Sequence, residues 1–143
     1  MDASIQVTFD TADPHAQADF WAAVLGYEVE NGPEVSEFVD SLVESGRLPP
    51  DERIYRNGRS LFKVAAAAHD PSGKRPRLYF QQVPEGKVAK NRVHLDLNVG
   101  EENVLAEVAR VEALGATRLW VTSDRGPVTY TMQDPEGNEF CIA

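Results

Sequence analysis

Cysteine is nearly absent from the sequence, since Cys141 is the only one among 143 residues. A single cysteine cannot form an internal disulfide, so the sequence excludes a disulfide-stabilised scaffold and gives no sign of an oxidising compartment. Cys141 lies in the final segment, DPEGNEFCIA. Two interpretations follow for this thiol, a small core residue or a chemically active group.

Basic residues and long apolar runs are also scarce. The chain has 14 Lys and Arg against 23 Asp and Glu, which gives a formal net charge of -9. Because phosphate backbones and anionic membranes would be repelled on average, we expect no nucleic-acid partner. No apolar run approaches membrane-spanning length, and MDASIQVTFD lacks the basic and apolar regions of a signal peptide, so we expect a cytoplasmic protein without a membrane partner.

Three segments have the periodicity of amphipathic helices, and each is followed by glycine. The first begins at Pro14 after the N-cap Asp13 and ends at Gly26. The second covers residues 34–45, and the third covers residues 101–114. The residues expected on their buried faces are Phe20, Trp21, Val24, Leu25, Val35, Phe38, Val39, Leu42, Val43, Val104, Leu105, Val108, Val111 and Leu114.

Eight short segments have the alternation or the β-branched and aromatic content of strands. We expect residues 46–58, which contain Pro49, Pro50, Asn57 and Gly58, to form a loop. The predicted strands are IQVTFD, YEVE, SLFKVAAAA, RLYFQQV, RVHLDLNV, TRLWVT, PVTYTMQ and NEFCIA.

The order of these elements repeats along the chain. Asp-Pro-x-Gly follows a predicted strand twice, as DPSG at 70–73 and as DPEG at 134–137, with each residue at its favoured turn position. The sequence therefore predicts one α+β domain over residues 1–143, made of two βαβββ modules at about 3–84 and 91–143. The first module contains an extra inserted helix.

These motifs resemble the vicinal oxygen chelate superfamily, which includes glyoxalases and bleomycin-resistance proteins. The matching stretches are DTADPHAQADFWAAVLGYEV, VPEGKVAKNRVHLDLNV, VEALGAT and DPEGNEF, and the group they look most like is the bacterial glyoxalase-like domain. The resemblance implies two modules related by a pseudo-twofold axis, whose curled mixed sheets surround a cleft. It leaves an insertion at residues 31–58 without a counterpart.

The resemblance also implies where a metal would bind. Metal-dependent members of the superfamily use His or Gln on the first strand of each module and Glu on the last. Carried onto this sequence, the four positions are Gln6, His94, Tyr79 and Cys141, although Gln81 lies on the same strand face as Tyr79. Because hard cations prefer anionic oxygen ligands and both glutamates are replaced, we expect no metal cofactor. A metal, if present, would be held by Gln6, His94 and Cys141.

Alternation on two strands indicates a polar face that the resemblance places in the cleft. On IQVTFD this face carries Gln6, Thr8 and Asp10, and on RVHLDLN it carries His94, Asp96 and Asn98. The alternative is a face that is merely solvated. The expected ligand-binding residues are Gln6, Thr8, Tyr79, Gln81, His94, Trp120, Tyr130, Met132 and Cys141, of which several aromatic and sulfur-containing side chains could equally belong to the core.

His94 and Asp96 are the candidate catalytic residues. Two residues apart on one strand face, they have α-carbons roughly 6 to 7 Å apart. A neighbouring carboxylate would raise the pKa of an imidazole that already titrates near neutral pH. The alternative is an ordinary polar network without catalysis.

Two functions of different class remain. The first is a metal-independent small-molecule binding protein, with its ligand in the cleft between the two modules. The second is an enzyme, either a metal-dependent lyase, isomerase or dioxygenase-like protein or a metal-free acid-base catalyst that uses His94. By resemblance we also expect a homodimer.

Overall fold

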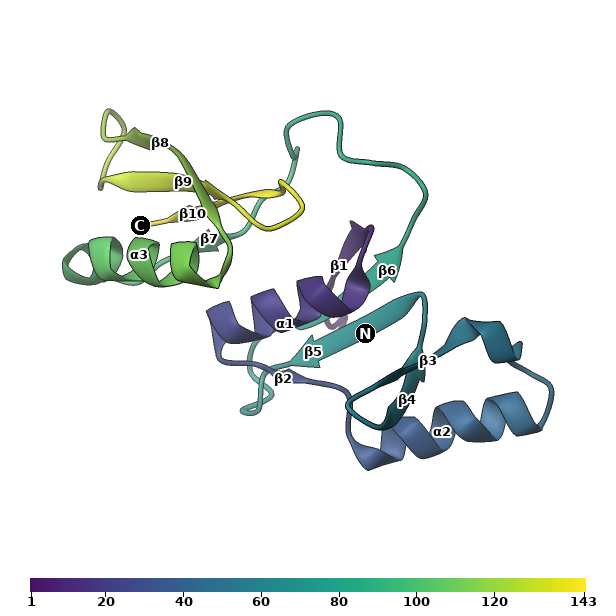
Figure 1. Cartoon of the computed structure of the whole chain (residues 1–143). Coiled ribbons are helices and arrows are strands. Elements are labelled where there is room, and N and C mark those ends of the chain that lie inside the picture. The colour runs from purple at the N-terminus through teal and green to yellow at the C-terminus, as the bar shows by residue number, and fades with distance from the viewer. The chain divides into compact units, whose positions relative to one another are not determined.

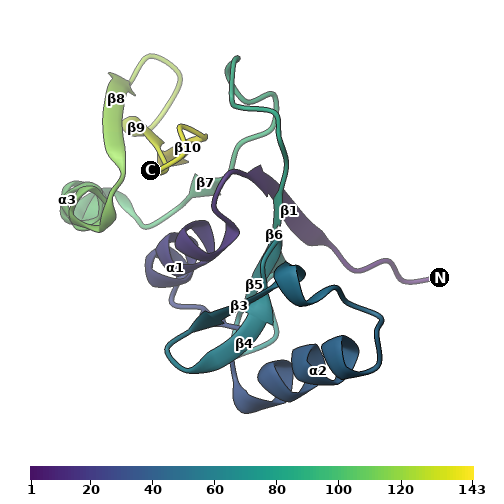
Figure 2. The same cartoon turned by 45° about the vertical axis from the view of Figure 1, so that its right-hand side comes forward.

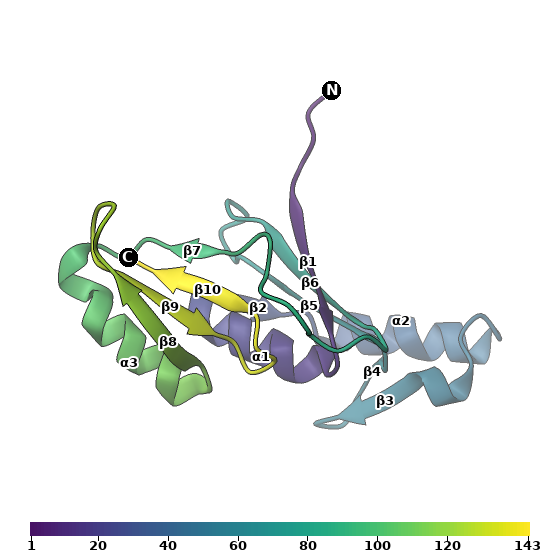
Figure 3. The same cartoon turned by 90° about the horizontal axis from the view of Figure 1, so that it is seen from above.

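A computed structural model describes residues 1–143, which fold into two units, Met1–Pro84 and Glu85–Ala143. We call them the N-terminal and C-terminal units and describe each by itself. Each unit has a mixed four-stranded sheet with a helix after its first strand, so the predicted α+β class and the two βαβββ-like modules are confirmed (Figure 1). Neither sheet is strongly curled, in contrast to the expectation (Figure 3). No helix has the length and apolar content that a membrane span requires.

The N-terminal unit is built on a sheet of strand order β1-β6-β5-β2. Strands β1 and β6 are parallel, and the other two pairs are antiparallel. A separate hairpin of β3 and β4 follows the inserted helix α2. The elements in order are β1 (Gln6–Thr11), α1 (Pro14–Leu25), β2 (Glu28–Val29), α2 (Pro33–Glu44), a 3-10 turn (Pro50–Glu52), β3 (Arg53–Arg56), β4 (Arg59–Phe62), β5 (Ala65–His69) and β6 (Arg77–Gln82).

Helix α1 forms where its local signals predict. The Asp13 side chain accepts a hydrogen bond from the Ala16 N–H at 3.1 Å, and Gly26 ends the helix with a φ of 68°. The helix packs on β5 and β6 (Figure 1). Trp21 is 1% exposed and lies 5.3 Å from the Phe9 ring, which stacks on Phe80. Burial of aromatic side chains of this size contributes about 1.5–3 kcal/mol each, so this contact anchors the sheet.

The insertion differs in part from the prediction. The expected helix is confirmed as α2, but the expected loop at residues 46–58 is wrong, because it contains the 3-10 turn and the first strand of the β3–β4 hairpin. Asn57 and Gly58 form its turn with φ of 51° and 76°, the conformation that favours Asn-Gly in two-residue hairpins. The predicted strand SLFKVAAAA is interrupted at Lys63 and Val64, since its first half pairs with β3. Helix α2 packs against β4 (Figure 2).

The C-terminal unit has strand order β7-β10-β9-β8, with β7 and β10 parallel. The predicted strand RVHLDLNV is mostly irregular, because only Asp96 and Leu97 pair with β10, and His94 lies just before the strand. Helix α3 covers one face of the sheet (Figure 3). The elements are β7 (Asp96–Leu97), a 3-10 turn (Glu101–Asn103), α3 (Val104–Leu114), β8 (Thr117–Thr122), β9 (Thr129–Gln133) and β10 (Glu139–Ile142).

Some predicted core positions are exposed. Phe38 on α2 is 55% exposed, and Leu105 and Leu114 on α3 are 67% and 39% exposed. Helix α3 instead buries a narrower stripe of Val104, Val108 and Val111. A three-turn helix over one small sheet covers only this stripe, so its flanking leucines remain in solvent.

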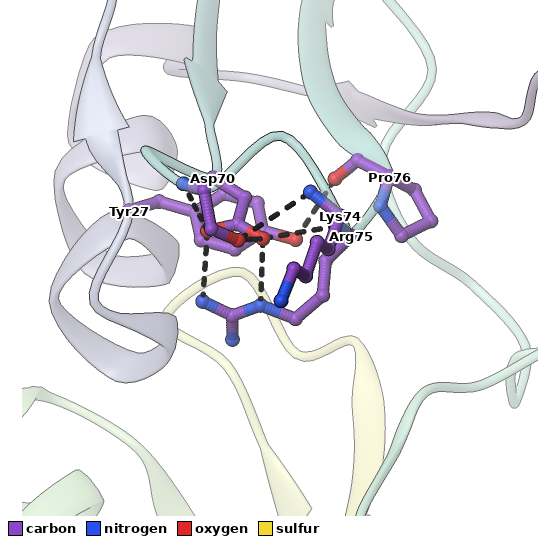
Figure 4. Close-up of polar contacts among 6 residues, drawn as sticks. Tyr27, Asp70, Lys74, Arg75 and Pro76 are labelled. Atoms are coloured by element: carbon purple, nitrogen blue, oxygen red, sulfur yellow. Dashed lines mark hydrogen bonds and ion pairs between the residues drawn. The ribbon is translucent and has the colours of Figure 1, made fainter.

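The two Asp-Pro-x-Gly turns are held by their aspartates. The Asp70 carboxylate accepts hydrogen bonds from Ser72 and from the backbone and guanidinium of Arg75 (Figure 4). These hydrogen bonds hold the pKa of Asp70 far below its ordinary value, and the one from the Arg75 side chain has the largest effect. The Arg75 guanidinium lies 4.7 Å above the ring of Tyr27, whose hydroxyl donates to the Pro76 carbonyl. In the other turn, Asp134 accepts from the N–H groups of Glu136 and Asn138.

Candidate functional site

The parallel strand pairs of the two units have the same register at the candidate positions. In the N-terminal unit Tyr79 on β6 lies opposite Thr8, two residues after Gln6. In the C-terminal unit Cys141 on β10 lies opposite Asp96, two residues after His94. The structure therefore puts Gln6 and His94 at equivalent places, and likewise Tyr79 and Cys141.

The C-terminal unit brings His94, Asp96 and Cys141 together. One donor atom of each lies within 4.8 Å of the other two. The imidazole Nδ1 of His94 is 2.8 Å from the Asp96 carboxylate, and the two side chains are 36% and 56% exposed. The Cys141 Sγ lies 3.6 Å from the Thr131 hydroxyl. This arrangement combines a nitrogen, an oxygen and a sulfur donor at one edge of the sheet.

The environment of Cys141 keeps its thiol protonated at neutral pH. Burial raises its pKa, and the negative charge of Asp96 raises it further. The Thr131 hydroxyl acts in the opposite direction but does not reverse the shift. Cys141 is thus not an activated nucleophile by itself, because the thiolate is the reactive form.

The equivalent polar face of the N-terminal unit is closed by an arginine. Arg77 donates from Nε and one terminal nitrogen to the two oxygens of Glu30, at 2.8 and 2.9 Å. Its other terminal nitrogen donates to the side-chain oxygen of Gln6 at 2.8 Å. The hydrogen bond from Arg77, aided by its charge and by His69, lowers the pKa of Glu30. Gln6 is therefore already engaged, and it offers no free oxygen in the manner of a metal ligand.

A cavity of about 310 Å³ lies within the N-terminal unit, between β2, β5, β6 and the inserted α2 and β4. Most of its walls are aliphatic or aromatic, and Glu30, Arg77 and Tyr79 supply polar groups. His15 also reaches it, with Nε2 2.8 Å from the Phe62 carbonyl. The remaining residues that line it are Val29, Asn31, Val35, Phe38, Arg56, Leu61, Phe62, Val64, Ala65, Ala66 and Ala67.

The other candidate residues lie apart from these two places. Thr8 is exposed, and Gln81 donates to Asp10 at 2.8 Å. In the C-terminal unit Trp120 is 46% exposed on β8, and Met132 is fully buried. The Tyr130 ring lies 5.3 Å below the guanidinium of Arg118.

Sequence reasoning missed most of the cavity. Four of its lining residues, Asn31, Val35, Phe38 and Arg56, lie in the insertion at residues 31–58, for which the resemblance offered no counterpart, and six more lie at residues 61–67, in a predicted strand that was not assigned to a binding site. One signal was available, since Phe38 and Phe62 are aromatic residues on two polar, partly exposed segments. Their rings lie 6.2 Å apart, edge to face, and both line the cavity.

The residues present do not fit the hard-metal site of the superfamily. Of the four carried-over positions, Gln6 is bonded to Arg77 and Tyr79 lies beneath the same guanidinium, 5.7 Å from its ring centre. Neither position offers a carboxylate, and a neighbouring positive charge disfavours a cation. Only His94 and Cys141 remain as strong donors.

The comparisons with known proteins show the fold. A solved hypothetical protein of S. aureus has a TM-score of 0.63 at 14% identity, over 99% of this chain and 93% of its own. A glyoxalase/bleomycin resistance protein/dioxygenase family enzyme of Burkholderia phytofirmans PsJN has a TM-score of 0.61 at 18% identity, over 96% and 94%. The fosfomycin resistance protein FosX of Listeria monocytogenes, solved with Mn(II) and a sulfate ion, has a TM-score of 0.60 at 12% identity, over 99% and 89%.

Family membership follows from a match over almost the whole chain. No curated protein matches this sequence. The family model described as the glyoxalase-like domain matches residues 6–143, which include both parallel strand pairs and both Asp-Pro-x-Gly turns. The chain belongs to the family of glyoxalase-like domains.

Proposed function

We propose that the protein is a small-molecule binding protein of the glyoxalase and bleomycin-resistance type, and that it binds its ligand without a metal in the cavity of the N-terminal unit. The cavity carries this proposal. Its volume of about 310 Å³ is in the range of small-ligand pockets, roughly 300–1,000 Å³. Apolar walls with a few convergent polar groups are the usual composition of such pockets.

The lining defines the chemistry of the ligand. Glu30 and Arg77 neutralise each other through two hydrogen bonds, so the polar end of the cavity has no unpaired charge. Tyr79 makes no hydrogen bond through its hydroxyl within the unit, which leaves one donor and acceptor for a ligand. Phe38, Phe62 and the aliphatic walls favour an apolar body. The ligand class is therefore a neutral, mainly apolar molecule with one hydrogen-bonding group.

The test is equilibrium binding of a neutral apolar fluorescent probe, N-phenyl-1-naphthylamine, in buffer with EDTA. We expect saturable fluorescence enhancement with the wild-type protein. Ala65→Trp should abolish it, because the indole fills the cavity that Ala65 lines. Ala113→Trp places the same side chain on an exposed position of α3 and should leave binding unchanged. Equal binding by wild type and Ala65→Trp, or loss of binding in EDTA, would contradict the proposal.

A library of neutral apolar compounds then identifies the ligand by thermal shift. A ligand that binds only the native state at 100 times its Kd stabilises that state by about 2.7 kcal/mol. The melting temperature should therefore rise for wild type and Ala113→Trp and not for Ala65→Trp.

Enzymatic activity is the second candidate function. The 2.8 Å contact between His94 Nδ1 and the Asp96 carboxylate favours it. Such a contact fixes the tautomer of an imidazole and leaves the other ring nitrogen to hold or transfer a proton. The Burkholderia relative is named as a family enzyme, which agrees with this candidate in fold alone.

Recovery of the ligand separates the two functions. A compound bound by the wild-type protein is incubated with it and analysed by mass spectrometry and NMR. Unchanged ligand supports the binding protein. Chemical conversion by wild type but not by His94→Asn would establish the enzyme.

We also propose a homodimer, an expectation that comes from the resemblance to binding proteins of this type. Size-exclusion chromatography with light scattering measures the mass directly. A mass of one chain, 15.8 kDa, at micromolar concentration would contradict it.

A further inference from the structure

His15 is a buried histidine to which the proposed function gives no role. It lies in the first turn of α1, lines the cavity of the N-terminal unit and is only 7% exposed. Its Nε2 lies 2.8 Å from the backbone carbonyl oxygen of Phe62, the last residue of β4. This contact joins α1 to β4 and holds the imidazole in one orientation at the cavity wall.

The contact with Phe62 also determines which imidazole nitrogen carries the hydrogen. A carbonyl oxygen can only accept a hydrogen bond, so Nε2 is the donor. In a neutral imidazole the other nitrogen, Nδ1, then has a lone pair and can only accept. Nδ1 makes no hydrogen bond within the protein and is not sealed from solvent. His15 therefore has an acceptor without a partner, and the cavity is where a partner can enter.

The other polar groups of the cavity do not distinguish ligands in the same way. The two oxygens of Glu30 accept from Arg77, so this carboxylate is occupied. Arg56 can only donate, and it is engaged by a carboxylate on α1. The Tyr79 hydroxyl and the Asn31 side-chain amide can each donate and accept, so they suit either a ligand hydroxyl or a ligand carbonyl. Selection for a donor on the ligand thus falls to the histidine.

We infer that His15 is a specificity-determining residue of the cavity, and that its Nδ1 accepts a hydrogen bond from a hydroxyl or N–H group of the ligand. This inference rests on the proposed function and narrows its ligand class. Among neutral, mainly apolar molecules of one shape, phenols, alcohols and N–H compounds are preferred to ethers, ketones and hydrocarbons. The reason is that a ligand without a donor leaves the buried acceptor unpaired, which weakens binding.

Two ligands of similar shape test this preference. The compounds are 2-naphthol and 2-methylnaphthalene, which differ by a hydroxyl in place of a methyl group. Each displaces bound N-phenyl-1-naphthylamine at neutral pH, with the Kd of the probe measured separately for every variant. The result is the ratio of the Kd of 2-methylnaphthalene to that of 2-naphthol, and comparing this ratio between proteins cancels the different hydration of the two compounds. His15→Phe should lower the ratio by about three- to tenfold, the contribution of one hydrogen bond.

Nitrogen NMR of the imidazole tests the assignment without a substitution, which matters because His15→Phe also removes the hydrogen bond to Phe62. The chain has three histidines, and the signals missing from His15→Phe are those of His15. In the ligand-free wild-type protein Nε2 should carry the hydrogen and Nδ1 should not. Addition of 2-naphthol should then shift the Nδ1 resonance to lower frequency, and 2-methylnaphthalene should shift it much less.

His69→Phe is the matched control, because His69 lies in the same unit but does not line the cavity, and it should keep the wild-type ratio. The inference is overturned by an unchanged ratio in His15→Phe, by a hydrogen on Nδ1 in the free protein, or by a ratio that falls in Tyr79→Phe and not in His15→Phe. In these cases binding of N-phenyl-1-naphthylamine still supports the proposed function. Absence of that binding in the wild-type protein would contradict the proposed function and this inference with it.

Discussion

The two units have the same arrangement of strands, but the polar side chains on equivalent positions differ in charge. In each, a parallel pair places the candidate residues in the same register, and an Asp-Pro-x-Gly turn precedes the last strand. Arg77 begins β6 and Glu139 begins β10, so equivalent positions carry opposite charges. Arg77 closes the polar face of the N-terminal unit. The C-terminal unit leaves His94 and Asp96 in solvent.

This difference gives the polar faces of the two units different chemical properties. Around Arg77 the polar groups satisfy one another, and the inserted α2 and β4 add apolar walls, which suits a ligand without charge. Around Cys141 the donors remain available. The two units thus share one strand arrangement. At the start of the last strand, Arg77 holds Gln6 in the N-terminal unit, whereas Glu139 in the C-terminal unit is held by Lys87 and the Asn91 N–H.

The largest expected effect is on stability, and it tests the strand arrangement that both units share. Phe80 on β6 and Ile142 on β10 follow the candidate residues Tyr79 and Cys141, and both are fully buried. Phe80→Ala should reduce the free energy of unfolding by about 3–5 kcal/mol, and Ile142→Ala by about 2–5 kcal/mol. Urea denaturation measures both. Tyr79→Phe, on the opposite face of β6, is the control and should change stability little.

The next largest effect, also on stability, compares the opposite charges of Arg77 and Glu139 at the starts of β6 and β10. Burial would raise the pKa of Glu139, but hydrogen bonds from the Asn91 N–H and Lys87 outweigh it and lower the pKa. Glu139→Gln should therefore destabilise the protein by about 1–3 kcal/mol, the range for hydrogen bonds to charged groups. Arg77→Gln should cost below about 1 kcal/mol, because its side chain is 41% exposed and solvent screens its ion pair.

Hydrogen exchange distinguishes the two variants further. The Asn91 N–H donates to Glu139 at 2.9 Å, so Glu139→Gln should accelerate exchange in the segment before β7. In Arg77→Gln that segment should exchange at the wild-type rate. Equal acceleration in both variants would remove the distinction between the units.

A smaller effect is the pH dependence of stability, which should differ between the two Asp-Pro-x-Gly turns. Since the folded-state pKa of Asp70 is lowered, the unfolded state binds its proton more tightly. The stabilisation is complete above the unfolded pKa of about 4 and decreases as pH falls from there toward the folded-state value. Asp70→Asn should melt at a lower temperature than wild type at pH 7, and this difference should shrink below about pH 4.

Asp134→Asn is the matched variant, because Asp134 accepts hydrogen bonds from the backbone N–H groups of Glu136 and Asn138 and from the Asn138 side-chain amide in the other turn. Melting curves of both variants from pH 7 to pH 3 make the comparison. A difference between Asp70→Asn and wild type that grows on acidification would contradict the assigned direction.

Local signals in the sequence correctly predicted local features, namely the ends of a helix and the buried face of a strand. Asp13, Pro14 and Gly26 determine both ends of α1, and their chemistry acts over a few residues. Alternation also assigned the faces of β1 correctly, since Val7 and Phe9 are more buried than Gln6 and Thr8. The Asn57-Gly58 turn was an equally local signal, but together with Pro49 and Pro50 it was read as part of a loop.

Long-range partners were beyond such reasoning. Gln6 and Arg77 are 71 residues apart, and nothing near Gln6 indicates that a guanidinium will occupy its oxygen. Asp96 joins Cys141 only through the parallel register of β7 and β10. The cavity depends on how α2 and β4 pack, which is a tertiary property without a sequence motif.

The smallest expected effect concerns the thiol itself. Burial is the main reason that the pKa of Cys141 is raised, and the Asp96 charge adds to it. Alkylation by iodoacetamide requires the thiolate, so the rate in native, metal-free protein should stay low at pH 7–8 and rise above the ordinary thiol pKa of about 8.5. Asp96→Asn should shift this pH profile modestly downward, because it removes the smaller of the two causes, with little change in stability. In urea both proteins should react with the same profile. An unchanged or upward-shifted profile in Asp96→Asn would contradict the assigned direction, because removal of a carboxylate that raises the pKa of the thiol must lower that pKa.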